Sequence, residues 1–99
     1  MILEVASLQV KHGMEIEFEE AFRKASAIIS SMEGYQSHQL HRCMEAEAKY
    51  LLLVQWDALE DHTIGFRESE EYQQWKKLLH HFYDPVSYTH LTLPTMAVV

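Results

Sequence analysis

The sequence is poor in cysteine, glycine, proline and basic residues, and two of these shortages exclude particular kinds of site. Cys43 is the only cysteine, so an internal disulfide and a cluster of thiolate metal ligands are both excluded. The 99 residues contain eight Lys and Arg against fifteen Asp and Glu, which gives a net charge of -7 at pH 7. Nucleic acids and anionic membranes are bound through clusters of Lys and Arg, so we expect neither as a partner.

Long apolar runs are also missing. No run approaches the roughly eighteen apolar residues of a membrane span. The N-terminus, Met1 to Glu4, lacks the basic start and apolar core of a signal peptide. We therefore expect a single cytoplasmic domain. A chain this short buries only about 60–70% of its unfolded surface, which favours further burial against a partner.

The clearest pattern begins at Tyr50. Residues 50–54, YLLLV, have strand length and are apolar on both alternating faces, which predicts a strand buried on both sides. Asp57 and Glu60 then have the spacing of a capping box, in which the Asp57 carboxylate accepts a backbone N–H of the first helical turn. We therefore predict a strand followed directly by a short helix.

A longer helix is predicted after the short one. Gly65 weakens the first helix, and Ser69 offers a second N-cap. The Asp84-Pro85 pair is expected to end the long helix. Its apolar stripe at helical spacing comprises Tyr72, Trp75, Leu78, Leu79 and Phe82.

The first half of the chain supplies two strands and a helix. Residues 2–10 alternate in polarity, and 15–32 carry an apolar stripe at helical spacing that Gly34 ends. Residues 35–43 precede the turn-like stretch 45–48, so we expect a hairpin with the Tyr50 strand. The face of the first strand expected to meet the helices comprises Ile2, Ala6, Leu8 and Val10.

This order of elements predicts an α+β, ferredoxin-like fold. With one last strand it reads β-α-β-β-α-β, and both helices then cover one face of an antiparallel sheet. The other face would be bare in a monomer. Because the Tyr50 strand is apolar on both faces, we expect a homodimer joined sheet against sheet.

Four segments resemble the antibiotic biosynthesis monooxygenase family: GYQSHQLHRC (34–43), KYLLLVQW (49–56), LEDHTIGFRESEEYQQW (59–75) and LLHHFYDP (78–85). The resemblance covers Met1 to Pro85. It implies a ferredoxin-like protomer that pairs into a dimeric α/β barrel. It also implies oxidation of a small aromatic or quinol-like substrate by O2 without a cofactor.

The resemblance ends at Pro85, and Val86 to Thr95 instead resembles a translated sequencing adapter. We therefore interpret 1–85 as the domain and 86–99 as a non-native tail that replaces the family's last strand. Residues 87–93 nevertheless alternate, and the edge of the first strand offers unpaired backbone groups. We expect 87–93 to lie there as a short strand that Pro94 ends.

The seven histidines do not predict a metal site. His38 and His41 are three apart on a predicted strand and so point to opposite faces, and His80 and His81 diverge by about 100° on a helix. The alternative to a functional role is that a histidine is simply an exposed residue or a hydrogen-bonded core residue. His38 and His62 are the candidates for acid–base catalysis, and His80 is a candidate for substrate binding, because they lie in segments that carry the resemblance.

Three aromatic residues are candidates for binding a planar substrate. Trp56 ends a strand just before a helix start, where the mouth of a pocket would lie, and Phe66 and Trp75 follow it in the chain. Core packing is the alternative, and it is favoured for Trp75 because that residue belongs to the helical stripe.

Three functions are compatible with the resemblance. The first is a cofactor-independent monooxygenase, an oxidoreductase, and the second is a non-catalytic barrel that binds a small ligand. The third is haem degradation, which in the same superfamily uses an Asn, a Trp and a His. Trp56 matches that Trp, but the Asn position falls on Ala6 and the His position near Lys76, which disfavours this function.

Overall fold

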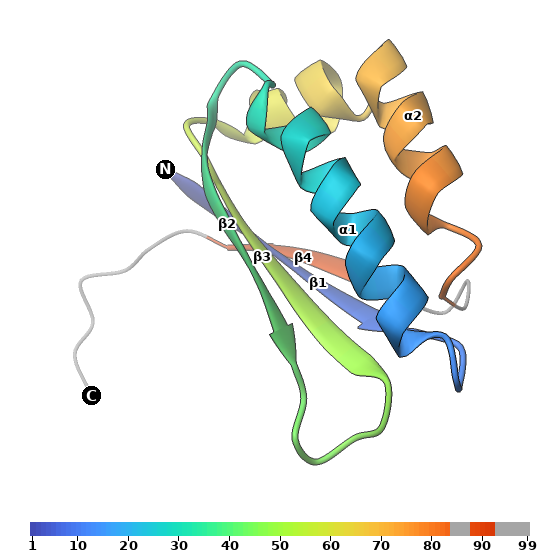
Figure 1. The fold of residues 1–99 in the computed structure, drawn as a ribbon. Helices are drawn as coiled ribbons and strands as arrows, with labels where there is room; N and C mark the ends of the chain where they lie inside the picture. Colours follow the sequence, from blue (N-terminus) through green and yellow to red (C-terminus); the bar gives the residue numbers. More distant parts are fainter. Residues whose placement is uncertain (84–87, 93–99) are drawn as a thin grey trace, which may run out of the picture.

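The structure is a computed structural model that describes residues 1–83 and 88–92. It confirms the predicted order of strands and helices, including the short helix between β3 and α2, which is a π-helix, η1 (Figure 1). The elements are β1 (Ile2–Gln9), α1 (Glu15–Ser30), β2 (Tyr35–Arg42), β3 (Lys49–Trp56), η1 (Asp61–Phe66), α2 (Glu70–Leu79) and β4 (Tyr88–Thr92).

The strands of the described residues form one four-stranded sheet in the order β2-β3-β1-β4. Every neighbouring pair is antiparallel, and β1 lies between β3 and β4. The expected short strand beside β1 is present as residues 88–92, with Leu3 opposite Thr92 and Ser7 opposite Tyr88. The predicted stop at Pro94 lies outside the described residues.

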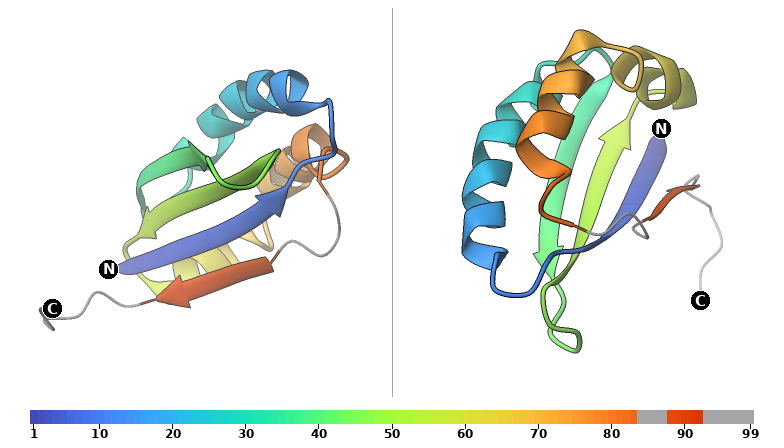
Figure 2. Two further views of the ribbon diagram at one scale, coloured as in Figure 1. Left: turned by 90° about the horizontal axis from the view of Figure 1, so that it is seen from below. Right: turned by 90° about the vertical axis from the view of Figure 1, so that its right-hand side faces the viewer.

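Both helices cover the same face of the sheet (Figure 2). The strand residues that point toward the helices are buried, as alternation predicts. This buried face comprises Glu4, Ala6, Leu8 and Val10 from the β1 segment and Tyr50, Leu52, Val54 and Trp56 from β3. Opposite it, α1 contributes Phe18, Phe22, Ala25 and Ile29, and α2 contributes Trp75 and Leu79.

Among the residues that the structure describes, no helix or strand covers the other face of the sheet in the single chain (Figure 2). Leu51 and Leu53 of β3 are therefore only half-buried, although the apolar run predicts burial on both sides. Leu3 and Val5 of β1 lie on this same face and are half-buried too. We call these four residues the open apolar face.

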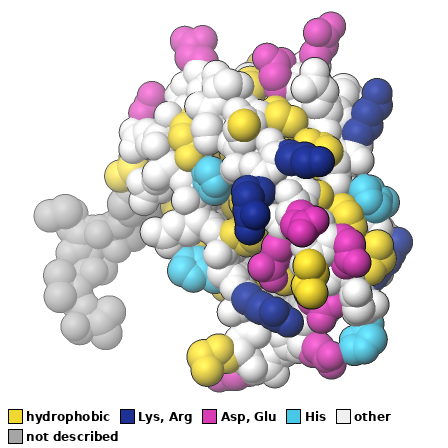
Figure 3. Space-filling model, viewed as in Figure 1, with side chains coloured by type: hydrophobic (Ala, Val, Ile, Leu, Met, Phe, Trp, Pro, Cys, Tyr) yellow, Lys and Arg dark blue, Asp and Glu magenta, His cyan; other side chains and the backbone are white. Residues whose placement is uncertain are grey.

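The helix side of the molecule has a different surface. Acidic and basic side chains gather there close together, with hydrophobic groups scattered between them (Figure 3). None of the described helices is long and apolar enough to cross a membrane.

The start of the second helical region differs from the predicted capping box. Gln36 Nε2 donates to the Asp57 carboxylate, and Asp61 instead accepts from the Ala58 N–H at 3.0 Å. The turns that follow widen into η1, where the Arg67 N–H donates to the His62 carbonyl. Asp57 therefore joins β2 to the end of β3 rather than capping a helix.

The long helix begins as predicted and ends earlier. Ser69 Oγ accepts from the Tyr72 N–H at 3.1 Å, which confirms the second N-cap. The helix ends at Leu79, not at Asp84-Pro85, because the chain then turns to meet the loop after β1. There the Lys11 N–H donates to the Phe82 carbonyl at 2.7 Å, so Phe82 is buried outside the helix.

Candidate active site

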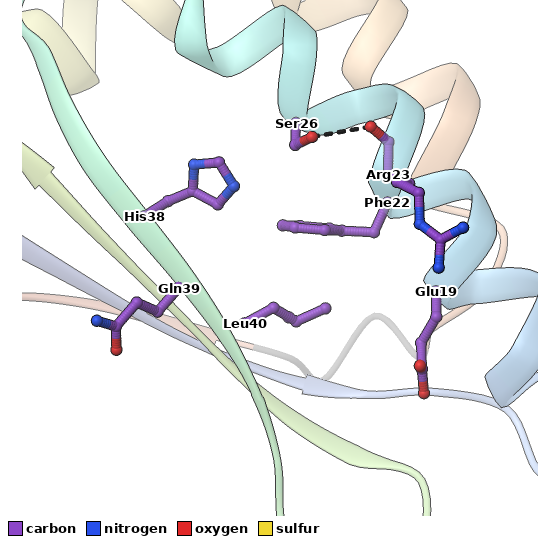
Figure 4. A pocket seen from close by; sticks show the side chains of 7 residues that line it. All are labelled: Glu19, Phe22, Arg23, Ser26, His38, Gln39 and Leu40. Carbon is purple, nitrogen blue, oxygen red and sulfur yellow. Dashed lines mark hydrogen bonds between the residues drawn. The ribbon is translucent and has the colours of Figure 1, made fainter.

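A groove of about 330 Å³ opens between α1 and the edge strand β2 (Figure 4). Its α1 side chains come from positions 19, 22, 23 and 26, which lie on one side of the helix because residues three and four apart are neighbours on its surface. His38 and Leu40 alternate on β2 and both project toward α1, whereas Gln39 points away (Figure 4). The groove is lined by Glu19, Phe22, Arg23, Ser26, His38, Gln39 and Leu40.

His38 is the histidine that this groove presents. Its half-buried ring meets Phe22 edge-on, with 5.8 Å between the ring centroids, and its Nδ1 lies 2.6 Å from the Tyr35 hydroxyl oxygen. Burial lowers the pKa of His38 below its ordinary value of 6.5, so the ring is uncharged at neutral pH. Since Tyr35 occupies Nδ1, Nε2 is the ring nitrogen left for a ligand.

Behind the groove the aromatic residues form a closed circle of ring contacts. Centroid distances between neighbours run from 5.6 to 6.3 Å, the usual range for packed aromatic pairs. In order, the circle is His38, Phe22, Trp75, Phe66, Trp56 and Tyr35. The three residues predicted to bind a planar substrate therefore lie together. They are buried in the core, however, behind Phe22 and His38. These three are Trp56, Phe66 and Trp75.

His62 attaches to this circle through Trp56, at 5.8 Å between ring centroids. It lies on η1 and is only 4% exposed. Its Nε2 is 3.2 Å from Glu4 Oε2, and Trp56 Nε1 donates to the other Glu4 oxygen at 3.0 Å. A buried carboxylate thus joins the two residues.

Glu4 is a site residue that the sequence reasoning missed. It occupies the helix-facing side of β1, opposite Val54 of β3, and is 7% exposed. The available signal was its position as the one charged residue among Ile2, Ala6, Leu8 and Val10 on an otherwise apolar face.

His80 lies apart from the groove, at the end of α2. The residue is exposed, and its ring contacts those of Tyr72 and Tyr83 at 6.1 and 5.4 Å. Partial burial, and then the charges of Lys76 and Arg67, lower the pKa of His80. Tyr72 also packs on Phe66, so His80 reaches the aromatic circle only through an intervening ring.

The described residues contain no group of three or more His, Cys, Asp and Glu side chains arranged to hold a metal ion. Instead, His38 pairs with the Tyr35 phenol and His62 pairs with the Glu4 carboxylate. Such pairs bind hydroxyl groups and move protons.

The fold and this cluster define a ferredoxin-like α+β domain with a histidine- and aromatic-rich site between its helices and its sheet. The sequence profile of the antibiotic biosynthesis monooxygenase family matches residues 1–78. The chain belongs to this family.

Individual relatives agree with this assignment. The uncharacterized protein YczJ of Bacillus subtilis (strain 168) is 61% identical over 85 residues, which cover 86% of this chain and 90% of YczJ. The crystal structure of a Bordetella bronchiseptica protein assigned to the antibiotic biosynthesis monooxygenases is 30% identical, with a TM-score of 0.91 over 96% of this chain and 97% of that one. SnoaB from Streptomyces nogalater, a cofactor-independent oxygenase, shares the fold at 20% identity, with a TM-score of 0.80 over 98% of this chain and 95% of its own.

Proposed function

We propose that the protein is a cofactor-independent monooxygenase that oxidises a small aromatic or quinol-like substrate with O2. Family membership supports oxygenase chemistry, and SnoaB, which shares the fold, is described as a cofactor-independent oxygenase. The observation that carries the proposal is the continuous cluster of histidines and aromatic rings that begins at the α1–β2 groove. Planar rings suit an aromatic substrate, and an uncharged histidine such as His38 suits removal of a hydroxyl proton.

The reaction needs a base and an electron-rich substrate. A histidine, His38 at Nε2 or His62 at Nδ1, takes the proton of a substrate hydroxyl. The anion then gives electrons to O2 directly. In the overall change a ring C–H carbon and the carbon that bears the deprotonated hydroxyl both become carbonyl carbons, one oxygen atom of O2 enters the product and the other leaves as water. All four electrons that reduce O2 come from these two carbons, so no further reductant is required.

In this proposal Phe22 and His38 face the substrate in the groove. Trp56, Phe66 and Trp75 pack behind them and keep water away, and His80 lies at the far end of the same network of rings. Fixing the substrate and lowering its contact with water would supply most of the rate. A groove of about 330 Å³ suits one small aromatic molecule.

The test is oxygen uptake by the purified protein with a panel of dihydroxyaromatic compounds. With ¹⁸O2, mass spectrometry should find one labelled atom in the product. His38→Asn and His62→Asn are compared with His12→Asn, a histidine whose side chain is 80% exposed and does not line the groove. Loss of uptake in either of the first two variants but not in the His12 variant supports the proposal. Thermal stabilisation by a compound without any uptake across the panel would instead indicate a non-catalytic ligand-binding protein.

A further inference from the structure

Glu4 is an unusual residue for the centre of a small domain. It is 7% exposed, and within the described part of the chain no Lys or Arg forms an ion pair with it. A buried carboxylate without a cation is stabilised only by hydrogen bonds to it. Two ring N–H groups provide them, Trp56 Nε1 to one oxygen and His62 Nε2 to the other. Packing alone does not explain a buried carboxylate at this position.

The contact with Glu4 determines which nitrogen of His62 carries the proton. An ionised carboxylate only accepts hydrogen bonds, so the nitrogen 3.2 Å from Glu4 Oε2 must be the N–H. In the uncharged ring the other nitrogen, Nδ1, then has a free lone pair.

Within residues 1–83 and 88–92 this second nitrogen has no partner. His62 Nδ1 is buried and makes no hydrogen bond to any of these residues, although buried polar atoms are nearly always paired. The ring that bears it packs against Trp56, a member of the aromatic circle. The arrangement is that of a base held from behind by a carboxylate, with its accepting atom still vacant.

We propose that Glu4 is a positioning residue for the oxygenation described above, on which this inference rests. Glu4 keeps the proton of His62 on Nε2, so that Nδ1 accepts the hydroxyl proton of the substrate, and it holds the Trp56 indole in place beside that ring. When Nδ1 takes the proton, the Glu4 carboxylate stabilises the resulting imidazolium. His62 is then the base, and because its Nδ1 is buried and outside the lining of the groove, the substrate must enter past the groove toward Trp56 to reach it.

The first test needs neither a variant nor a substrate. In protein labelled with ¹⁵N at histidine, long-range ¹H–¹⁵N spectra distinguish the two uncharged forms of each ring. At a pH where the ring is uncharged, His62 should carry its proton on Nε2. A ring protonated on Nδ1 would overturn the role of Glu4 in the native protein itself.

The second test is Glu4→Gln. The amide presents one acceptor and one donor, so it cannot accept from both rings, and His62 should shift toward the form protonated on Nδ1. We expect kcat to fall about 100-fold or more with a smaller change in KM, and Glu4→Asp to restore part of the loss. The matched control is Glu20→Gln, an exposed carboxylate on α1. A Glu4→Gln protein with native kcat overturns the inference and leaves the oxygenation standing, whereas absence of uptake by the native protein overturns the oxygenation.

Discussion

The Tyr35 hydroxyl oxygen lies 2.6 Å from His38 Nδ1, and this contact fixes how the imidazole meets the groove. Either atom can donate, since a phenol is both donor and acceptor. If the His38 N–H donates to Tyr35, Nε2 has a free lone pair; if the tyrosine donates, Nε2–H is a donor to the ligand. In both cases Nε2 is the atom directed to a bound molecule.

Tyr35→Phe should therefore weaken turnover without removing it. The ring of His38 loses one hydrogen bond, worth about 1 kcal/mol, which corresponds to about a fivefold fall in kcat/KM. Oxygen uptake measures the change, with Ser37→Ala on the opposite face of β2 as the control. An unchanged kcat/KM for Tyr35→Phe would show that the contact has no part in catalysis.

His38 should make the protein less stable in mild acid. Because burial lowers the pKa of the folded-state ring, the unfolded chain binds its proton more readily. His38 does not affect the pH dependence of stability well above its ordinary pKa of 6.5, and it destabilises the fold progressively as the pH falls below that value. His38→Asn should thus reduce the drop in melting temperature between about pH 7.5 and 5.5. Glu19 and Arg23 face the same groove and remain in both proteins, so an equal drop in each would contradict the prediction.

Ser69→Ala should cost about 1 kcal/mol of the free energy of unfolding. The Ser69 hydroxyl accepts from the Tyr72 N–H and also donates to the Phe66 carbonyl at 2.6 Å, so the change removes both of these side-chain hydrogen bonds. Chemical denaturation measures the loss. Ser30→Ala is the control, because that hydroxyl bonds only to its own helix, at Ser26, and alanine is the better helix former. Equal stabilities for the two variants would exclude a capping role.

We propose that the open apolar face joins two chains into a homodimer. Light scattering should give twice the chain mass, and Leu53→Lys should return it to the mass of one chain, because the charge would be buried between the two sheets. Ile16→Lys, at a 74% exposed position on α1, should leave the dimer intact. A native protein that stays monomeric at micromolar concentration would exclude this interface.

We further propose that residues 86–99 do not belong to the natural domain. Within them, Tyr88–Thr92 occupy the edge beside β1, where any alternating segment finds unpaired backbone groups. Their amides should exchange with solvent faster than those of residues 50–54 in β3. Equal protection of the two strands would make the tail a true element of the fold.

Most of the fold follows from local patterns in the chain. The buried side chains of α1 lie within the predicted stripe, and β1, β2 and β3 end within one or two residues of their predicted bounds. The end of α2 at Leu79 could not be predicted from local patterns, because it depends on a backbone hydrogen bond between Phe82 and Lys11 at the opposite end of the chain. The short helix after β3 was predicted, but its π-helical form has no clear sequence signal.

The site was predictable only in part. Alternation along β2 is enough to place His38 on the helix side, two residues from Leu40. The contact between Glu4 and His62 depends on β1 pairing with β3 and on the path of η1 over that pair. Residues so far apart in the sequence carry no shared periodicity, so only the assembled sheet reveals the pair.

The central place of β1 has a consequence for how the protein is made. This strand leaves the ribosome before both of its neighbours, and its partner β3 begins only at Lys49. At about 5–20 residues per second, roughly 2–10 seconds pass before that partner emerges. Until then only α1 is available to shield Ala6, Leu8 and Val10, so the earliest strand of the nascent chain is the one most exposed to chaperones and to other unfinished copies.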